Sequence, residues 1–386
     1  MVGLSMDEAG QQKRTRLADL NPIPALFTMA PAHRDHEVAI RCGITVLVPL
    51  LTLLLIGRID LAIFASFGAF TAIYGRNLQH GPRLQMQARA GALMFVVLLL
   101  ATLAGRNGMS GTEDPWALVG LTTVVAGLCA VVSAYWNLRP SGSLFHIFAF
   151  AAVSSVPYQP PLGEAMLTAA ATIVFALVVG ISSRVLPRNR HRIQRPEGQP
   201  LTGPRHRLVW SEAAWYVVAA GVSGSLATAL GPVLGIQHNY WAMVAAVVPL
   251  VGHSTRYRVN RGIQRIIGTF LGLLVLAAVL WIHPPLWVIV LIIAGLQCTA
   301  ELFIARQYVL AQIAVTPLAL LSTVLAMSAS TAAVDTSGLV YDRFIETVIG
   351  AVVGMACVLT PWAWRKWVLH SASPSRIAPA EGHRQS

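Results

Sequence analysis

Apolar runs that are long enough to cross, or nearly cross, a lipid bilayer alternate with short polar segments along this chain. A transmembrane helix needs about 20 predominantly apolar residues. Several runs are shorter, and the second and fifth have only about 16 residues, so tilting or irregular ends buried in protein are expected there. The pattern predicts an all-α polytopic membrane protein, a bundle of about 12 transmembrane helices near residues 38–57, 60–75, 84–105, 115–135, 143–158, 162–186, 209–230, 239–253, 258–282, 284–304, 308–328 and 341–363.

Polar segments divide the chain into five parts. We expect cytoplasmic tails over residues 1–37 and 364–386. The long polar segment at 187–208 is rich in Arg, Pro and Gly, and it separates a first membrane half (38–186) from a second (209–363). The first 37 residues lack the apolar core of a signal peptide, so the first span is expected to serve as the targeting signal.

The two halves look like repeats of one another. In each half the second span is short and leads into a loop that carries several arginines. An even number of spans in each half would make the copies parallel, related by an axis along the membrane normal. We therefore expect two parallel six-helix repeats.

The composition strengthens this interpretation. Hydrophobic residues make up 55% of the chain and charged residues only 11%, whereas soluble domains average about 25% charged residues. With the amino terminus inside, the cytoplasmic segments hold 25 of the 28 Lys and Arg residues, and Arg58, Arg106 and Arg343 are the exceptions. Because cytoplasmic loops carry an excess of cations, both termini are expected to be cytoplasmic. The net charge of +12 is explained in this way, and no nucleic-acid partner is expected.

Signatures of enzymes and metal sites are not found in the sequence. There is no Walker loop, no HExxH and no GxSxG in a strand-turn-helix context. His33 and His36 fall short of the four ligands of a structural metal site, so they are interpreted as solvated tail residues. The four cysteines sit singly in apolar runs and are expected to be buried thiols. The sequence predicts no enzyme, no metal and no cofactor.

The most distinctive stretch is RYRVNRGIQRIIGTFLG, from Arg256 to Gly272. Arg258, Arg261 and Arg265 recur at i, i+3 and i+7, which places them along one side of a helix, and Gln264 and Thr269 add neutral polar groups. Such a row of cations either fixes this end of the helix in the cytoplasm or attracts anions to a channel mouth. Gly268 and Gly272 form a small-xxx-small pattern that lets another helix come close.

Ionisable residues within the last spans admit two interpretations. Arg343 and Glu346 lie at i, i+3 and can pair along one helix face. They are either a structural ion pair at the interface, or an anion contact beside a carboxylate that relays protons. Glu301 and Arg306 flank the turn between the tenth and eleventh spans, where charges often mark only a cytoplasmic turn.

Proline and aromatic residues suggest further candidates. Pro317, after Thr316, interrupts the eleventh span and frees a backbone carbonyl, which is a common pointer to a substrate path. Pro49 and Pro249 have the same potential. The trio that opens the eighth span is either an interfacial aromatic belt or a surface that stacks on a planar ligand: His238, Tyr240 and Trp241.

These motifs, in this order, resemble those of the fusaric acid resistance protein-like family, also called aromatic acid exporters. The resemblance covers residues 238–358 and rests on YWA at 240–242, R-x-x-Q-R-x-x-G-T-x-x-G from Arg261 to Gly272 in staggered form, the stretch from Arg306 to Leu321, and R-x-x-E-T-x-x-G from Arg343 to Gly350. It implies a bacterial inner-membrane protein with two six-span halves, and several members are implicated in exporting aromatic carboxylic acids. Many bacterial members carry a large cytoplasmic domain after each half, where this chain has only the linker at 187–208.

The sequence thus predicts an inner-membrane exporter or channel for organic anions, with aromatic carboxylic acids as the class that the resemblance suggests. Glu346 is the expected proton-coupling residue. The expected substrate-binding residues are Arg258, Arg261, Gln264, Arg265, Thr269, Arg306, Tyr308, Thr316 and Arg343.

The expected partners are a small organic anion and membrane lipid. A homodimer is an open option, because the glycine-lined faces Gly268/Gly272 and Gly350/Gly354 suit contacts within or between chains. The alternative function is a non-transporting membrane protein that scaffolds or modifies the cell envelope; a lipid-modifying enzyme is disfavoured by the absence of a catalytic constellation. A polar cavity from the arginine loop toward Thr316 would favour the transporter.

Overall fold

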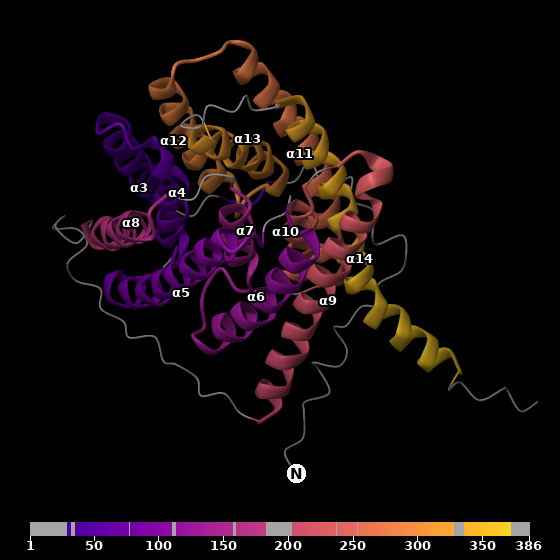
Figure 1. Ribbon diagram of the computed structural model, residues 1–386. Coiled ribbons are helices and arrows are strands. Elements are labelled where there is room, and N and C mark those ends of the chain that lie inside the picture. Colours follow the sequence, from indigo (N-terminus) through magenta and orange to yellow (C-terminus); the bar gives the residue numbers. More distant parts are fainter. Residues whose placement is uncertain are drawn as a thin grey trace, which may run out of the picture.

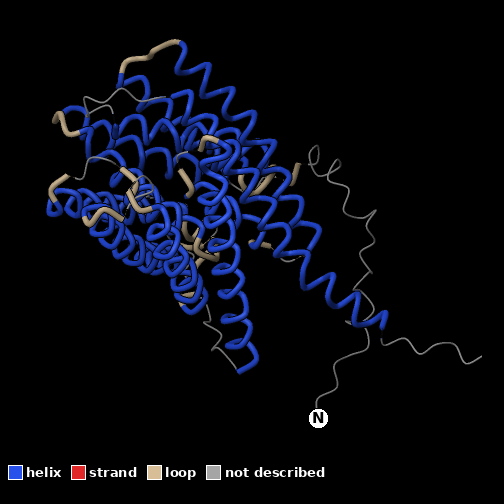
Figure 2. Tube along the Cα trace, turned by 45° about the vertical axis from the view of Figure 1, so that its right-hand side comes forward, coloured by secondary structure: helices blue, strands red, loops and turns tan. Residues whose placement is uncertain are grey.

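The computed structural model is a bundle of helices (Figure 1), and the residues it describes contain no strand (Figure 2). They are residues 29–31, 35–76, 78–109, 113–156, 160–182, 203–236, 238–252, 254–327 and 336–371, with side chains described except at 203–205, 336–337 and 361–371. The predicted all-α polytopic bundle is confirmed. Its elements are α3 (Asp35–Leu55), η2 (Ile59–Leu61), α4 (Ala62–Ala69), η3 (Phe70–Ile73), α5 (His80–Arg106), α6 (Pro115–Tyr135), α7 (Leu144–Ser154), α8 (Leu162–Ser182), α9 (Gly203–Leu234), α10 (Tyr240–Val247), η6 (Val248–Leu250), α11 (Thr255–Trp281), α12 (Leu286–Phe303), α13 (Tyr308–Met327) and α14 (Thr336–Ser371).

The twelve predicted runs correspond to nine long helices and three short apolar segments within the described residues. The short segments are the second, fifth and eighth: Ile59–Ile73, Leu144–Ser154 and Tyr240–Leu250. Every residue of α4 and of α10 is buried. Because protein rather than lipid surrounds these segments, their irregular ends do not expose backbone polar groups to hydrocarbon.

The segment Ile59–Ile73 returns along α3, with which η2, α4 and η3 all make contact. Arg76, three residues after this segment, forms an ion pair with Asp35, the first residue of the 21-residue helix α3.

Corresponding helices pack together in both halves. Within the halves, α5 packs on α7 as α11 packs on α13, and α4 packs on α8 as α10 packs on α14. Between the halves, α3 packs on α12 as α9 packs on α6 (Figure 1). In each of these comparisons the paired helices hold the same positions in the order of spans within their halves. Two six-helix repeats would produce this correspondence. The direction of the axis that relates them stays a prediction.

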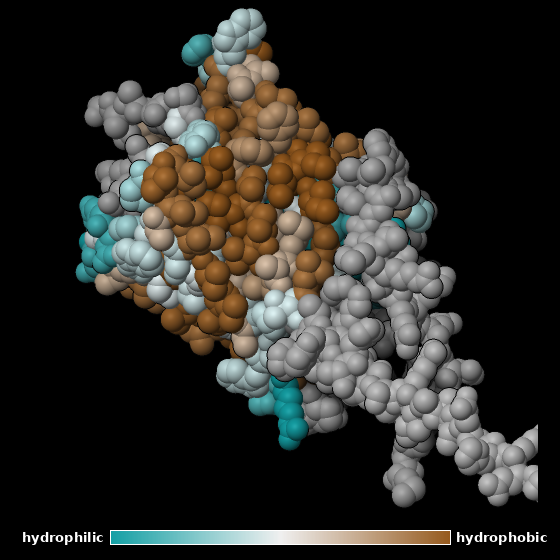
Figure 3. Space-filling model, turned by 90° about the vertical axis from the view of Figure 1, so that its right-hand side faces the viewer, coloured by the Kyte–Doolittle hydropathy of each residue, from teal (hydrophilic) through white to brown (hydrophobic). Residues whose placement is uncertain are grey.

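The central helices are α4, α7, α10 and α13, since α7 contacts α10 and α13 contacts α4 across the junction of the halves. The outward faces of the long helices are apolar, with exposed side chains such as Val218 and Val222 of α9 and Phe270 and Leu274 of α11. Figure 3 shows a broad apolar band on one face of the molecule. Such a surface suits contact with lipid tails.

Several helices extend beyond the predicted segment boundaries. Helix α9 begins at Gly203, inside the predicted linker, and α14 continues to Ser371, inside the predicted tail. Polar sequence therefore does not mark where these helices end, because helical hydrogen bonds continue through it. Residues 1–28, 32–34 with His33, 183–202 and 372–386 lie outside the described residues. All four cysteines are free; Cys42, Cys129 and Cys357 are buried as predicted, whereas Cys298 is only half-buried, contrary to the prediction.

Candidate anion site: a column of arginines

The predicted arginine row lies on α11 and runs inward along it. Ser254 caps this helix, because its hydroxyl accepts a hydrogen bond from the Tyr257 backbone N–H. Arg258 and Arg261 are half-buried, and Arg265 is 4% exposed. Arg265 lies ten residues into the helix, about 15 Å from its start. The row therefore begins in the first turn of α11 and reaches deep into this helix, rather than lying only at its amino-terminal end.

Two glycines bring α11 against α13. A Cβ atom on Gly272 would lie 2.8 Å from Cβ of Thr316 and 2.9 Å from the carbonyl oxygen of Ile313. Gly268 meets Gln312 in the same way. The predicted close approach at these glycines is confirmed. The Ile313 carbonyl is the one that Pro317 cannot pair with, so the proline break faces a neighbouring helix instead of opening a path.

Gln312 joins the polar side chains of the two helices. Its Nε2 donates to the hydroxyls of Thr316 (3.0 Å) and Thr269 (3.3 Å). Its Oε1 accepts from Nη1 of Arg265 (3.2 Å) and from the Tyr308 hydroxyl (3.4 Å). Sequence reasoning missed this residue. Its spacing of four residues from both Tyr308 and Thr316 was the available signal.

Neutral groups hold the arginines of α11. Arg258 donates from Nε to the Gly252 carbonyl (2.7 Å). Arg261 lies over the Tyr308 ring, with Cζ 4.3 Å from the ring centroid. Within the described part of the chain, Arg258, Arg261 and Arg265 form no salt bridge. Together with Arg343, these three define what we call the arginine column; buried Gln264 lies on the same helix.

Arg343 lies near the start of α14 and is buried, 1% exposed. Its Cζ lies 3.6 Å from the centroid of the Trp241 ring, and its Nε and Nη1 atoms have no hydrogen-bond partner. The charge of Arg265 is near enough to repel it. Arg343 therefore adds to the row on α11 a buried cation that forms no salt bridge among the described residues.

The predicted pairing of Arg343 with Glu346 is wrong. Oε2 of Glu346 instead accepts hydrogen bonds from the backbone N–H groups of Trp241 (2.8 Å) and Ala242 (3.3 Å). These N–H groups belong to the first turn of α10, where a helix leaves donors unpaired and carries partial positive charge. Glu346 thus caps α10, and its other oxygen has no partner.

The aromatic residues that open α10 are not an interfacial belt, since Tyr240 and Trp241 are both buried. Beside them, Nδ1 of His238 lies 2.9 Å from Oδ2 of Asp342. Burial lowers the pKa of His238, but the hydrogen bond with Asp342 and the charges of Glu346 and Asp342 outweigh it. The pKa of His238 is therefore raised above its usual value.

Arg306 lies apart from the arginine column. It lies between α12 and α13, where its Nε donates to the Ala30 carbonyl (3.3 Å) and its own carbonyl accepts from the Ala30 N–H (3.1 Å). The short turn points its side chain toward the amino-terminal segment. Glu301, the other charge at this turn, is buried in an ion pair with Arg76.

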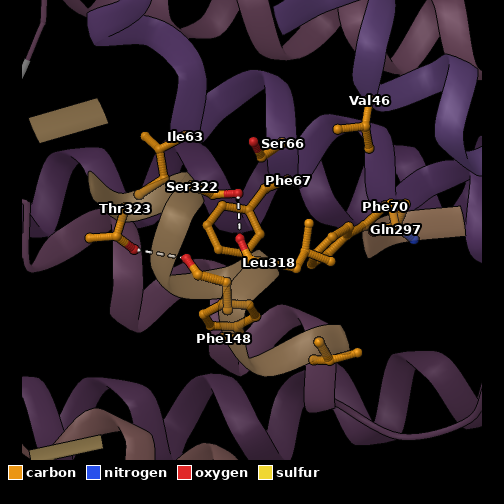
Figure 4. Close-up of a pocket in the computed structure, with 12 residues that line it drawn as sticks. Val46, Ile63, Ser66, Phe67, Phe70, Phe148, Gln297, Leu318, Ser322 and Thr323 are labelled. Atoms are coloured by element: carbon orange, nitrogen blue, oxygen red, sulfur yellow. Dashed lines mark hydrogen bonds between the residues drawn. The ribbon is translucent and has the colours of Figure 1, made fainter. Parts of the chain in front are cut away.

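A cavity of about 40 Å³ lies between the two halves, among α3, α4, α7, α12 and α13. Figure 4 shows its lining, which includes the rings of Phe67, Phe70 and Phe148 and the polar side chains of Ser66 and Gln297. The ring of Phe148 also packs on Trp241, with 4.9 Å between the centroids. Aromatic side chains therefore connect this cavity to Arg343. The predicted polar route from Arg265 to Thr316 is instead filled by side chains that bond to one another.

Comparison with known proteins bears on this half of the chain. Residues 226–357 match the model of the fusaric acid resistance protein-like family. This segment is thus similar to fusaric acid resistance protein-like proteins. All four arginines of the column fall inside this fusaric acid resistance protein-like segment. The resemblance inferred from the motifs is confirmed for these residues, in a polytopic membrane protein with several apolar helices.

The chain is also similar to the uncharacterized membrane protein YvaC of Bacillus subtilis (strain 168). It is 29% identical over 128 residues, which cover 33% of this chain and 20% of YvaC. The match therefore spans about a fifth of that relative's length. No solved structure matches the chain.

Proposed function

We propose that this protein is a bacterial inner-membrane exporter of organic anions, and that the arginine column carries the anion. The observation behind this proposal is Arg343, a buried cation with two unpaired nitrogens and no salt bridge to the nearby Glu346. An ionised side chain at membrane depth costs several kcal/mol unless it is paired. A passing anion would supply the missing partner.

Aromatic carboxylates are the substrate class that we favour. A guanidinium group binds a carboxylate through two parallel hydrogen bonds and also stacks on aromatic rings. Arg343 already lies on Trp241, which continues through Phe148 to Phe67. An aromatic acid would meet a cation and ring surfaces together along this line.

Protons are our candidate for the coupling ion, with Glu346 as their carrier. Glu346 is fully buried, and only one of its two oxygens is hydrogen-bonded. Carboxylates in this position often relay protons in transporters. In the proposed orientation both termini and the start of α11 face the cytoplasm, so the column would take up anions there.

The test is accumulation of a labelled aromatic carboxylate in cells that lack the protein, express it, or express Arg265→Ala. The intact protein should lower accumulation and Arg265→Ala should not. Arg256→Ala is the control, because Arg256 is exposed and belongs to the same helix. If all strains match across a panel of organic anions, with the protein present in the membrane, the function is the non-transporting scaffold or envelope-modifying role.

A further inference from the structure

The matched packing of the two halves creates two corresponding corners where the spans end on the arginine-rich side. One lies among α3, α12, α5 and α8, beside the turn after η3. The other lies among α9, α6, α11 and α14, beside the turn after η6. These elements have the same ranks in their halves. The two corners can therefore be compared directly.

Buried charges fill the first corner, which we call the sealed corner. Arg76 forms salt bridges from Nη2 to Oδ1 of Asp35 (2.8 Å) and from Nη1 to Oε2 of Glu301 (2.7 Å). Both carboxylates are nearly inaccessible to solvent. The charge of Arg76 is therefore compensated by two acids, while the neighbouring Arg41 and Arg83 donate hydrogen bonds to the carbonyls of Ala72 and Gly180.

The second corner, the open corner, contains a cavity of about 190 Å³. Its lining includes Arg258, the first arginine of the column, together with Trp215, Tyr216 and Glu212. The hydrogen bond from Nε of Arg258 to the Gly252 carbonyl fixes the guanidinium group at this cavity. Arg258 forms no salt bridge among the described residues, so its charge is available.

We propose that the open corner is the site where the anion first binds, and that it takes a carboxylate with a single ring and a single negative charge. This inference rests on the proposed export function. The volume lies below the range of about 300–1,000 Å³ for drug-sized ligands, which favours one ring. Arg258 would bind the carboxylate, and Trp215 and Tyr216 offer ring surfaces. Exposed Glu212 would repel a second negative charge.

Thiol labelling tests this site without depending on transport. Thr255 lines the open corner as the first residue of α11, and His80 is the first residue of α5 beside the sealed corner. Thr255→Cys and His80→Cys are each introduced into a protein whose four native cysteines are replaced. A membrane-impermeant thiol reagent is then applied to inside-out vesicles. Benzoate should slow labelling at position 255 and leave labelling at position 80 unchanged.

Two arginine variants locate the benzoate contact. Arg258→Ala should raise the benzoate concentration needed for protection by about tenfold, the loss expected for a charge-assisted contact. Arg256→Ala should leave it unchanged, because Arg256 does not line the cavity. Succinate, which carries two charges, should protect less than benzoate. Ser141→Cys, on the loop that also lines the cavity, replaces Thr255→Cys if the latter does not fold.

The outcomes separate this inference from the export function. Protection at 255 that depends on Arg258 supports the site. Equal protection at both corners, or none at 255 while cells still export benzoate, overturns the site and leaves export standing. Absence of both protection and export, for the protein in the membrane, overturns both.

Discussion

At the scale of single residues, the polar interior depends on neutral partners. The arginines are held by a side-chain amide (Gln312), by aromatic rings (Tyr308 and Trp241) and by backbone carbonyls. The nearby carboxylate of Glu346 instead caps α10. Neutral partners orient a guanidinium group without cancelling its charge. The column therefore keeps its positive potential for an anion.

Replacing Gln312 should separate structural from functional contributions. Gln312→Leu removes the hydrogen bonds of its side chain to Arg265, Tyr308, Thr269 and Thr316, and it should destabilise the protein by about 1–3 kcal/mol. Gln312→Glu keeps the shape and pairs with Arg265. It should keep the unfolding midpoint in detergent but abolish transport, because it neutralises Arg265 within the column. Wild-type transport by Gln312→Glu would contradict the role of the charge.

His238 should make stability depend on pH. Because its pKa is raised in the folded protein, its ion pair contributes fully below the usual histidine pKa of about 6.5. That contribution is lost as the pH rises through the raised value. The melting temperature of His238→Gln should therefore fall below wild type in mild acid and approach it at alkaline pH.

The matched control is His283→Gln, since His283 is exposed and lies next to the Trp281 carbonyl instead of an acid. It should melt like wild type at every pH. A difference for His238→Gln that widens as the pH rises would show that the ion pair does not act as described.

At the scale of helices, glycines set the spacing of the bundle. Gly268 and Gly272 admit α13, while Gly350 and Gly354 lie on the backbone carbonyls of Ala242 and Ala246 in α10. Both glycine-lined faces considered for a homodimer are thus used inside the chain. A dimer would need another surface.

Gly350→Ala should be destabilising, because the new methyl group would overlap the Ala242 carbonyl. Overpacking of this kind costs about 1–3 kcal/mol. Gly295→Ala on α12 is the control, since nothing lies within 4 Å of its added methyl group. Alanine is the better helix former, so this control should be neutral or slightly stabilising. Equal unfolding midpoints for the two variants would rule out the tight contact of α10 with α14.

The sequence predicted the helices better than their partners. Apolar length located the nine long helices and the three short segments, and a period of 3.6 residues placed Arg258, Arg261 and Arg265 on one face of α11. Neither pattern predicts which helix packs against that face, so the sequence did not indicate that Gln312 of α13 would bond to side chains of α11. The local i, i+3 spacing suggested an Arg343–Glu346 pair, but the unpaired N–H groups of α10 are a tertiary feature and bind Glu346 instead.

At the scale of the whole molecule, Arg76 ties the two halves together. Its partners Asp35 and Glu301 are separated from one another by most of the chain, and Glu301 also accepts a weak hydrogen bond from Gln297, which lines the central cavity. This network joins the junction of the halves to the cavity between them. Because Arg76 is far from Glu301 in the sequence, the sequence pattern suggested only that Glu301 marks a turn.

Glu301→Ala should weaken this junction. Removing one partner of a buried ion pair typically costs about 3–5 kcal/mol, because the remaining charge is left uncompensated. Chemical unfolding in detergent measures the loss. Glu164→Ala is the control, since its ion pair with Arg58 lies largely exposed and its removal should barely move the midpoint. Equal losses for both variants would mean that the Arg76 network does not hold the halves together.

The most direct measurement is flux of a labelled single-ring carboxylate into proteoliposomes that contain the purified protein. The account predicts flux through wild type and Arg256→Gln, and a rate lower by about tenfold or more for Arg265→Gln and Arg343→Gln, since each removes a charged contact with the passing anion. Unchanged flux in both column variants, or no flux through the wild type with any organic anion tested, would contradict it.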